Sequence, residues 1–348
     1  MTEVYFAIPG SIEQETGGYG YDRRLFSELP SFGVNVKHIE LPAGFPNPSP
    51  EECEAVAKRA AALPGESTLL IDGLAYGAFP KQLAEGIAQR IIALVHHPLA
   101  LEAGLSEKRQ NELVASERDA LSLADHVIAT SPSTKRILIA DYGVPEPHVT
   151  VAEPGTDPAQ RATGTGTPMQ LLCVGTITPR KGYDVLVEAL EPLRDLDWRL
   201  TIAGPDDRDS ETTAALRAQI TAAGLHDRIT LSGVVVPATL DRFYESADVF
   251  IMPSLYEGYG MALGEAMARG LPIICTTGGA AAETVPEGAA IKVAPGSSEF
   301  LTRALQNLLS DRKQRIRLAD AAWEAGRKLP TWSETARRVA AVVMGLKA

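Results

Sequence analysis

The chain has 348 residues, 45% of them hydrophobic and 22% charged, an ordinary composition for a globular protein large enough for two domains. Its net charge is −11, and most of the acidic excess lies in residues 1–160. This balance argues against a nucleic-acid partner and against a broad basic face for anionic lipids. A local basic patch is left open.

The sequence gives little evidence of a membrane-spanning segment or of an export signal. No apolar run approaches the ~20 residues of a membrane span. The N-terminus enters a strand pattern at once and lacks the basic head and apolar core of a signal peptide. Cys53, Cys173 and Cys275 are widely spaced, which fits buried thiols in a reducing compartment and not a disulfide framework or a zinc site. We expect a cytoplasmic protein without a transmembrane segment, with peripheral membrane contact left open.

Short apolar runs alternate with helical patterns along the whole chain, which predicts parallel sheets built from βα units. The runs fall into two sets of six without sequence repetition, so we expect an α/β protein with two Rossmann-like domains. The predicted strands are residues 4–8, 34–41, 68–72, 91–96, 126–129 and 149–151 in the first set, and 171–175, 199–203, 229–231, 249–252, 273–275 and 291–293 in the second.

The domain boundary is marked by residues 154–168, PGTDPAQRATGTGTP, which have no apolar periodicity and many breakers. We place the linker at 158–168. Ligands of open parallel sheets bind at the carboxyl ends of the strands, so with two such domains the expected site is the cleft between them.

Two polar segments follow strands of the first domain. Gly17, Gly18 and Gly20 precede a helical pattern, an order that lets backbone approach a ligand, although an ordinary turn is an equal alternative. The dinucleotide pattern G-x-G-x-x-G is not met. His96 and His97 end the fourth predicted strand at the ligand edge of the sheet, where either could also be a histidine satisfied by a neighbouring loop.

Arg180 and Lys181 lie in a turn between the first strand and first helix of the second domain. Two cations beside a helix start could neutralise a diphosphate. The alternative is a solvated basic turn, which the surrounding pattern V-G-x-x-x-P-R-K-G disfavours.

The stretch from Asp248 to Thr277 predicts strand, glycine-rich turn, helix, turn and strand. Backbone N–H groups near Tyr259, Gly260 and Met261 open the helix and suit a phosphate. Glu257 precedes them and Glu265 lies eight residues further on, so the two carboxylates could each accept hydrogen bonds from a diol on either side of a diphosphate. Alternatively, Glu257 only favours the helix N-terminus and Glu265 is a solvated helix residue.

The block PSLYEGYGMALGEAMARGLP, residues 253–272, resembles the signature of retaining, nucleotide-sugar-dependent glycosyltransferases of the family-four type, whose E-x7-E motif Glu257 and Glu265 match. The resemblance implies the GT-B fold, in which two Rossmann-like domains face each other across a cleft. It assigns residues 1–160 to the acceptor side and 168–328 to nucleotide-sugar binding. It implies that a final helix, within 329–348, packs back on the first domain.

The same resemblance implies roles for individual residues. His96, with His97 as the alternative, would contact the donor sugar, and Glu257 would orient it. Thr176 stands where many members place an arginine, which leaves Arg180 and Lys181 for the diphosphate. Residues assigned to donor binding are Gly17, Gly18, Gly204, Gly233, Val234, Tyr259, Gly260, Met261 and Glu265, and those suggested for the acceptor side are Tyr19, Tyr21, Asp22 and Arg23.

The resulting mechanism stabilises charge on a leaving diphosphate with cationic side chains and helix amides. We therefore expect no metal and no cofactor, with a nucleotide-diphosphate sugar as co-substrate and retention of configuration. Alternatives are an epimerase or a phosphorylase on the same fold, or a non-catalytic sugar-nucleotide sensor. The sugar, the base (UDP, GDP or ADP) and the acceptor are not identified by the sequence.

Overall fold

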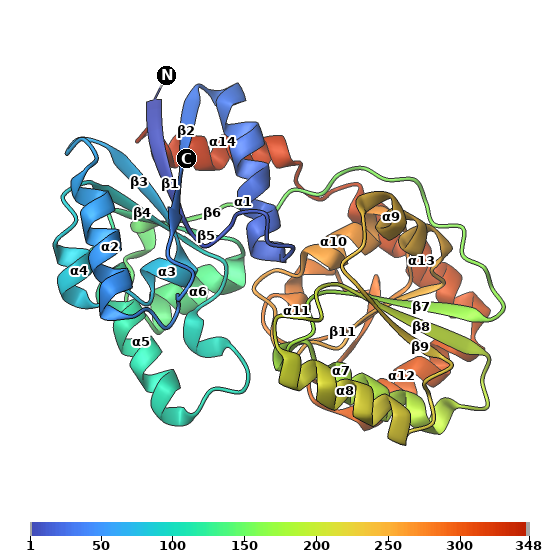
Figure 1. Cartoon of the computed structure of the whole chain (residues 1–348). Helices are drawn as coiled ribbons and strands as arrows, with labels where there is room; N and C mark the ends of the chain where they lie inside the picture. Colours follow the sequence, from blue (N-terminus) through green and yellow to red (C-terminus); the bar gives the residue numbers. More distant parts are fainter. Residues whose placement is uncertain (1, 346–348) are drawn as a thin grey trace. The chain divides into compact units, whose positions relative to one another are not determined.

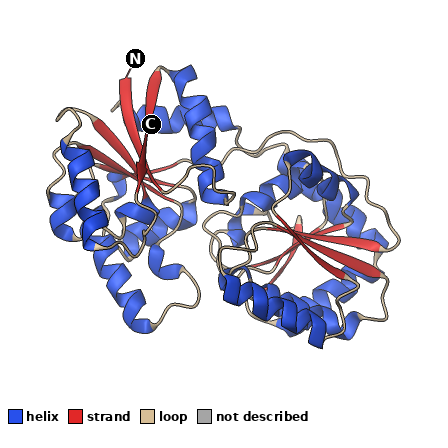
Figure 2. Ribbon diagram, in the orientation of Figure 1, coloured by secondary structure: helices blue, strands red, loops and turns tan. Residues whose placement is uncertain are grey.

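The computed structural model describes residues 2–345, which fold into two compact units (Figure 1). The N-terminal unit comprises residues 2–14, 18–155 and 330–345, and the C-terminal unit comprises residues 15–17 and 156–329. In each unit, helices lie on both faces of a central sheet (Figure 2). In the described part of the chain, no helix combines the length and apolar character needed to cross a membrane.

The N-terminal sheet is parallel throughout, with strand order β2-β1-β3-β4-β5-β6. Its strands are β1 (Thr2–Pro9), β2 (Val34–Leu41), β3 (Thr68–Asp72), β4 (Arg90–Val95), β5 (His126–Ala129) and β6 (Val149–Val151). Its helices are α1 (Gly17–Glu28), α2 (Pro50–Ala61), α3 (Gly73–Tyr76), α4 (Lys81–Glu85), α5 (Glu107–Leu121), α6 (Pro132–Ala140) and, from the end of the chain, α14 (Trp332–Val343).

The C-terminal sheet is also parallel, in the order β12-β11-β10-β7-β8-β9. Its strands are β7 (Met169–Val174), β8 (Trp198–Ala203), β9 (Ile229–Gly233), β10 (Val249–Met252), β11 (Ile273–Thr276) and β12 (Ala290–Val293). Its helices are α7 (Tyr183–Leu190), α8 (Ser210–Ala222), α9 (Pro237–Ser246), α10 (Met261–Ala268), α11 (Ala281–Thr284), α12 (Ser298–Ser310) and α13 (Arg312–Gly326).

Burial explains why the sequences of these strands are continuous apolar runs and do not alternate between apolar and polar residues. All five residues of β3 and all four of β10 are buried, because helices cover both faces of each sheet. Within the described residues, all twelve predicted strands are present, with ends that agree within two residues. The predicted α/β class with two Rossmann-like domains is thus confirmed, and the cleft between them stays a prediction.

Each sheet has a point where strand order reverses, and such points are where open parallel sheets bind ligands. In the N-terminal sheet it lies between β1 and β3, with β4 next in line. In the C-terminal sheet it lies between β7 and β10. The loops after these strands carry most of the predicted site residues.

The domain boundaries differ from the predicted ones. The segment predicted as a linker belongs to the C-terminal unit, where the amides of Thr163 and Gly164 donate to the carbonyl of Glu245 at 3.0 and 3.1 Å. Helix α14 belongs to the N-terminal unit, and Arg90 donates to the carbonyls of Val342 and Val343. Residue 1 and residues 346–348 of the predicted segments lie outside the described residues.

Candidate functional site

The loop after β10 turns sharply into α10. Gly260 precedes the helix with φ +88°, a left-handed conformation that favours glycine. A Cβ at this position would also lie 3.0 Å from Cδ1 of Leu263. The turn presents the first amides of α10, beginning at Met261, at the carboxyl edge of the sheet. This arrangement suits an anion, as the sequence predicts.

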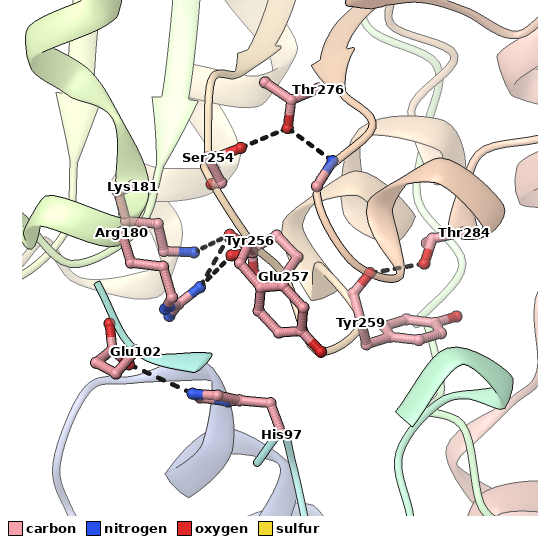
Figure 3. Close-up of polar contacts among 12 residues, drawn as sticks. His97, Glu102, Arg180, Lys181, Ser254, Tyr256, Glu257, Tyr259, Thr276 and Thr284 are labelled. Carbon is pink, nitrogen blue, oxygen red and sulfur yellow. Dashed lines mark hydrogen bonds and ion pairs between the residues drawn. The ribbon is translucent and has the colours of Figure 1, made fainter. Parts of the chain in front are cut away.

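Glu257 is held by the two cations of the neighbouring loop (Figure 3). Nζ of Lys181 lies 2.7 Å from its Oε1, and NH1 of Arg180 lies 3.4 Å from the same oxygen. NH1 of Arg180 also donates to the carbonyl of Tyr256 at 2.7 Å. Lys181 and Arg180 belong to a 3-10 turn, Pro179–Lys181, that follows β7. Because β7 and β10 are neighbours at the reversal point, residues about 76 positions apart meet there.

The charge state of this cluster follows from its contacts. Glu257 is 5% exposed, and burial alone would raise its pKa. The charges of Lys181 and Arg180 outweigh burial and lower the pKa of Glu257 to about 2. Its carboxylate is therefore ionised at neutral pH, and the three side chains carry a net charge of +1.

The Gly278-Gly279 turn explains how Glu257 is fixed. The amide of Glu257 donates to the carbonyl of Gly278 at 3.2 Å, and the carbonyl of Glu257 accepts from the amide of Ala280 at 2.8 Å. A Cβ on Gly278 would overlap the carbonyl of Leu255, and one on Gly279 would overlap the carbonyl of Glu257 itself. The glycine pair thus permits the close backbone approach that positions this carboxylate.

Glu265 is not a free surface carboxylate. Its Oε2 accepts a hydrogen bond of 2.6 Å from the hydroxyl of Tyr244, which is 1% exposed. The tyrosine ring stacks on Phe250 and lies under the guanidinium of Arg269, at 5.9 and 4.4 Å between centres. Sequence reasoning missed Tyr244, although its helix directly precedes the strand that leads to the central motif.

The other predicted donor-binding residues of the C-terminal unit lie at the same sheet edge. Gly204 follows β8, and its amide donates to the carbonyl of Gly233 at 3.0 Å. Gly233 ends β9 in the left-handed region, and Val234 follows it with 56% of its surface exposed.

Helix α1 already begins at Gly17, so Gly17 and Gly18 form the first turn of the helix and not a loop before it. A Cβ on Gly18 would lie 3.4 Å from Cδ2 of His96. The imidazole thus lies directly beside the helix start, at a distance that a small side chain at position 18 would also tolerate.

The two adjacent histidines have different surroundings. Nε2 of His96 lies 3.3 Å from Oδ1 of Asp22 and 3.4 Å from Oδ2 of Asp72. Nε2 of His97 lies 3.3 Å from Oε2 of Glu102, on a more exposed loop. His96 is thus paired with two carboxylates at the sheet edge, and its choice over His97 as the site histidine stays a prediction.

The residues suggested for the acceptor side are mostly structural. The buried hydroxyls of Tyr19 and Tyr21 donate to the carbonyls of Pro9 and Ala152. Arg23 donates to two carbonyls of the preceding loop, and Asp22 is fully buried. Both tyrosines are buried in the unit, and a contact of this segment with an acceptor stays a prediction.

Among the described residues, one group of three ligand-type side chains lies close enough together to hold a metal ion, and it consists of Asp22, Asp72 and His96. The distances within it are those of a histidine paired with two carboxylates. We therefore describe it as an ion-pair cluster and assign no metal to it.

Sequence comparison identifies relatives of both halves. The family described as "Glycosyl transferases group 1" matches residues 158–325, and "Glycosyltransferase Family 4" matches residues 69–160. Mannosylfructose-phosphate synthase of Agrobacterium fabrum is 30% identical over 264 residues, which cover 70% of this chain and 57% of the relative. A D-inositol 3-phosphate glycosyltransferase of an Arthrobacter species is 33% identical over 181 residues, 47% of this chain and 42% of the relative. The chain thus spans about half the length of these curated relatives.

Solved structures share the whole fold. Sucrose-phosphate synthase from Thermosynechococcus elongatus matches with a TM-score of 0.83 at 23% identity, covering 99% of both chains. Anabaena HepE in complex with UDP-glucose matches with a TM-score of 0.75 at 17% identity, covering 99% of this chain and all of that one. These likenesses, with the strand orders above, show the GT-B fold, and the two family matches show that the chain belongs to the family-four type of glycosyltransferases.

Proposed function

We propose that this chain is a retaining glycosyltransferase that moves a sugar from a nucleotide-diphosphate sugar to an acceptor without a metal ion. The observation that carries the proposal is the cluster of Glu257 with Arg180 and Lys181 beside the start of α10. A net positive charge next to the first amides of helix α10 attracts a diphosphate. The ionised Glu257 beside it suits the hydroxyls of the transferred sugar.

The proposed roles follow from charge. Negative charge develops on the diphosphate as the glycosidic bond breaks, and Arg180, Lys181 and the amides of residues 259–261 stabilise it without rearranging. Glu257 binds and orients the sugar. Because its carboxylate is engaged by two cations, we assign it no nucleophilic role. Glu265, oriented by Tyr244, accepts from the ribose.

The acceptor proposal rests on the relatives' names. The two curated relatives and the sucrose-phosphate synthase each carry a phosphorylated sugar or inositol in their names. We propose an acceptor of that class, a phosphorylated sugar or polyol.

The direct experiment is a thermal-shift screen of UDP-, GDP- and ADP-sugars, followed by product analysis with phosphorylated acceptors. A donor at 100 times its dissociation constant should add roughly 2.7 kcal/mol of stability. Transfer to an acceptor with retained configuration would support the proposal. Stabilisation by no sugar nucleotide would contradict it, and epimerised donor without transfer would identify an epimerase instead.

Chelation should not abolish activity. In the proposed mechanism, cationic side chains and helix amides neutralise the diphosphate as a divalent ion does in other enzymes, so we expect the rate in EDTA to match the untreated rate. Initial rates with and without EDTA provide the measurement. Loss of activity that magnesium or manganese restores would overturn metal independence.

Tyr244→Phe should weaken nucleoside diphosphate binding by roughly threefold to tenfold, since hydrogen bonds to charged groups are worth about 1.5–3 kcal/mol and part of that orients Glu265. Burial raises the pKa of Tyr244 well above its ordinary range, so the hydroxyl stays a donor. The matched control is Tyr76→Phe, which also removes a buried hydroxyl bond, to the carbonyl of Ala120. Calorimetric titration showing the same affinity in both variants would contradict this role for Tyr244.

A further inference from the structure

Asp22 is a buried acid that the proposed chemistry does not use. It projects from α1 and is fully buried. Neither of its oxygens meets the geometry of an ordinary hydrogen bond, and Nε2 of His96 is the cation at 3.3 Å. A buried carboxylate without hydrogen bonds is costly unless a positive charge compensates it. The structure offers that charge only if the imidazole is protonated.

Asp72 faces the same nitrogen from the other side. It ends β3 and caps α3, and its Oδ1 accepts a 2.6 Å hydrogen bond from the amide of Leu74. That bond fixes the carboxylate and leaves Oδ2 pointing at Nε2 of His96, 3.4 Å away. Two carboxylates from different elements therefore converge on one ring nitrogen.

The position of His96 is also fixed by contacts of its backbone and its ring. It is the first residue after β4, and its carbonyl accepts from the hydroxyl of Thr130 at 3.0 Å. The ring of Tyr21 meets the imidazole edge-on at 5.4 Å between centres. With Nε2 turned toward the acids, Nδ1 is the nitrogen turned away from them, and 21% of the side chain is exposed.

We propose that Asp22 and Asp72 are positioning residues that hold His96 as an imidazolium, so that Nδ1–H is offered to an oxygen of the substrate. This deepens, and rests on, the proposed glycosyl transfer. A charged donor serves a reaction in which negative charge develops on substrate oxygens, since hydrogen bonds from ionised donors are roughly twice as strong as neutral ones. A neutral histidine in the other tautomer would present a bare acceptor at Nδ1 instead.

The electrostatics of the cluster agree with a protonated His96. Burial by itself lowers the pKa of His96, but the nearby carboxylates of Asp22 and then of Asp72 raise it to about 10. Burial and the charge of Asp72 raise the pKa of Asp22, while His96 opposes that rise. Tyr21 also faces the ring, and burial raises its pKa, so it stays neutral. His96 is therefore expected to keep its proton through the neutral range.

Nuclear magnetic resonance of the protein labelled with ¹⁵N at its six histidines tests the charge directly. The signal of His96 is assigned by its absence in His96→Asn. We expect imidazolium nitrogen shifts for His96 at pH 8, well above the ordinary histidine pKa of about 6.5. Asp22→Asn and Asp72→Asn should each lower the midpoint of His96 by one pH unit or more. Asp72→Asn keeps an acceptor for the amide of Leu74, so it tests the proposal even if Asp22→Asn fails to fold.

The matched control is Glu117→Gln, which changes a fully buried carboxyl of the same unit that accepts from the amide of Leu99. It should leave the His96 midpoint unchanged. A neutral His96 at pH 8 in the unaltered protein, or equal midpoints in all variants, would overturn the proposal. So would one bound divalent metal per chain that Asp22→Asn removes. None of these readouts requires glycosyl transfer, so failure of the proposed function is recognised separately.

Discussion

Lys181→Met is expected to slow sugar transfer at least tenfold and to weaken nucleoside diphosphate binding in parallel. The substitution removes the cation closest to Glu257, at 2.7 Å, and takes the net charge of the cluster from +1 to zero. A tenfold loss corresponds to about 1.4 kcal/mol of transition-state stabilisation, well within what a preorganised charge supplies. Initial rates and calorimetric titration measure the two effects. Wild-type affinity and rate in this variant would show that Lys181 does not bind the diphosphate.

The same substitution should destabilise the fold, because it leaves a buried carboxylate with only Arg180, at 3.4 Å, as its counter-charge. Breaking a fully buried pair costs roughly 3–5 kcal/mol, and the remaining arginine should keep the loss below that range. Adding Glu257→Gln to Lys181→Met should recover stability but not activity. The control is Lys292→Met, because Lys292 is equally buried but pairs with the exposed Glu287.

The pH dependence of that stability loss has a definite sign. The pKa of Glu257 is about 2 in the folded chain, below the 4.5 of an unperturbed glutamate. A carboxylate with a lowered pKa stabilises the fold fully above its unfolded value and loses that contribution as pH falls toward the folded value. The destabilisation by Lys181→Met should therefore be complete at neutral pH and shrink below about pH 4.5. Denaturant unfolding at pH 7 and pH 3.5 provides the comparison.

The central motif could be predicted from the sequence because it is local. Glu257, Gly260 and Glu265 lie within nine consecutive residues of one strand–turn–helix unit, so their relation follows from helix geometry. The meeting of Glu257 with Arg180 and Lys181 needed one more step, the rule that parallel strands share a ligand edge. The structure supplies the contact itself, through the pairing of β7 with β10.

The cluster around His96 could not be predicted, since it depends on strand order. Asp22, Asp72 and His96 follow β1, β3 and β4, which are consecutive in the sheet but not marked as such in the sequence. Asp72 carried a usable signal, an acid at the end of a buried apolar run. Asp22 is suggested for the acceptor side together with its neighbours, and nothing in its sequence context marks it as a buried partner of His96.

The two glutamates of the central motif should differ in what they bind. Glu265→Gln is expected to weaken nucleoside diphosphate and whole donor alike, by about 1.5–3 kcal/mol, because both ligands contain the ribose and the carboxylate loses its charge. The glutamine oxygen can still accept from Tyr244, so the side chain should keep its orientation. The loss then reports the charge of Glu265 and not its position.

Glu257→Gln should leave nucleoside diphosphate affinity intact or slightly improved, yet lower the transfer rate by tenfold or more, about 1.4 kcal/mol per factor of ten. The sign follows from the cluster: a neutral amide beside Arg180 and Lys181 leaves two uncompensated cations, which favours an anion, while the sugar loses a charged acceptor. Titration with nucleoside diphosphate, run beside initial rates for each variant, separates the two cases. If both variants lost diphosphate affinity equally, both carboxylates would contact the nucleoside diphosphate. The proposed division, in which Glu257 binds the sugar and Glu265 binds the ribose, would then be wrong.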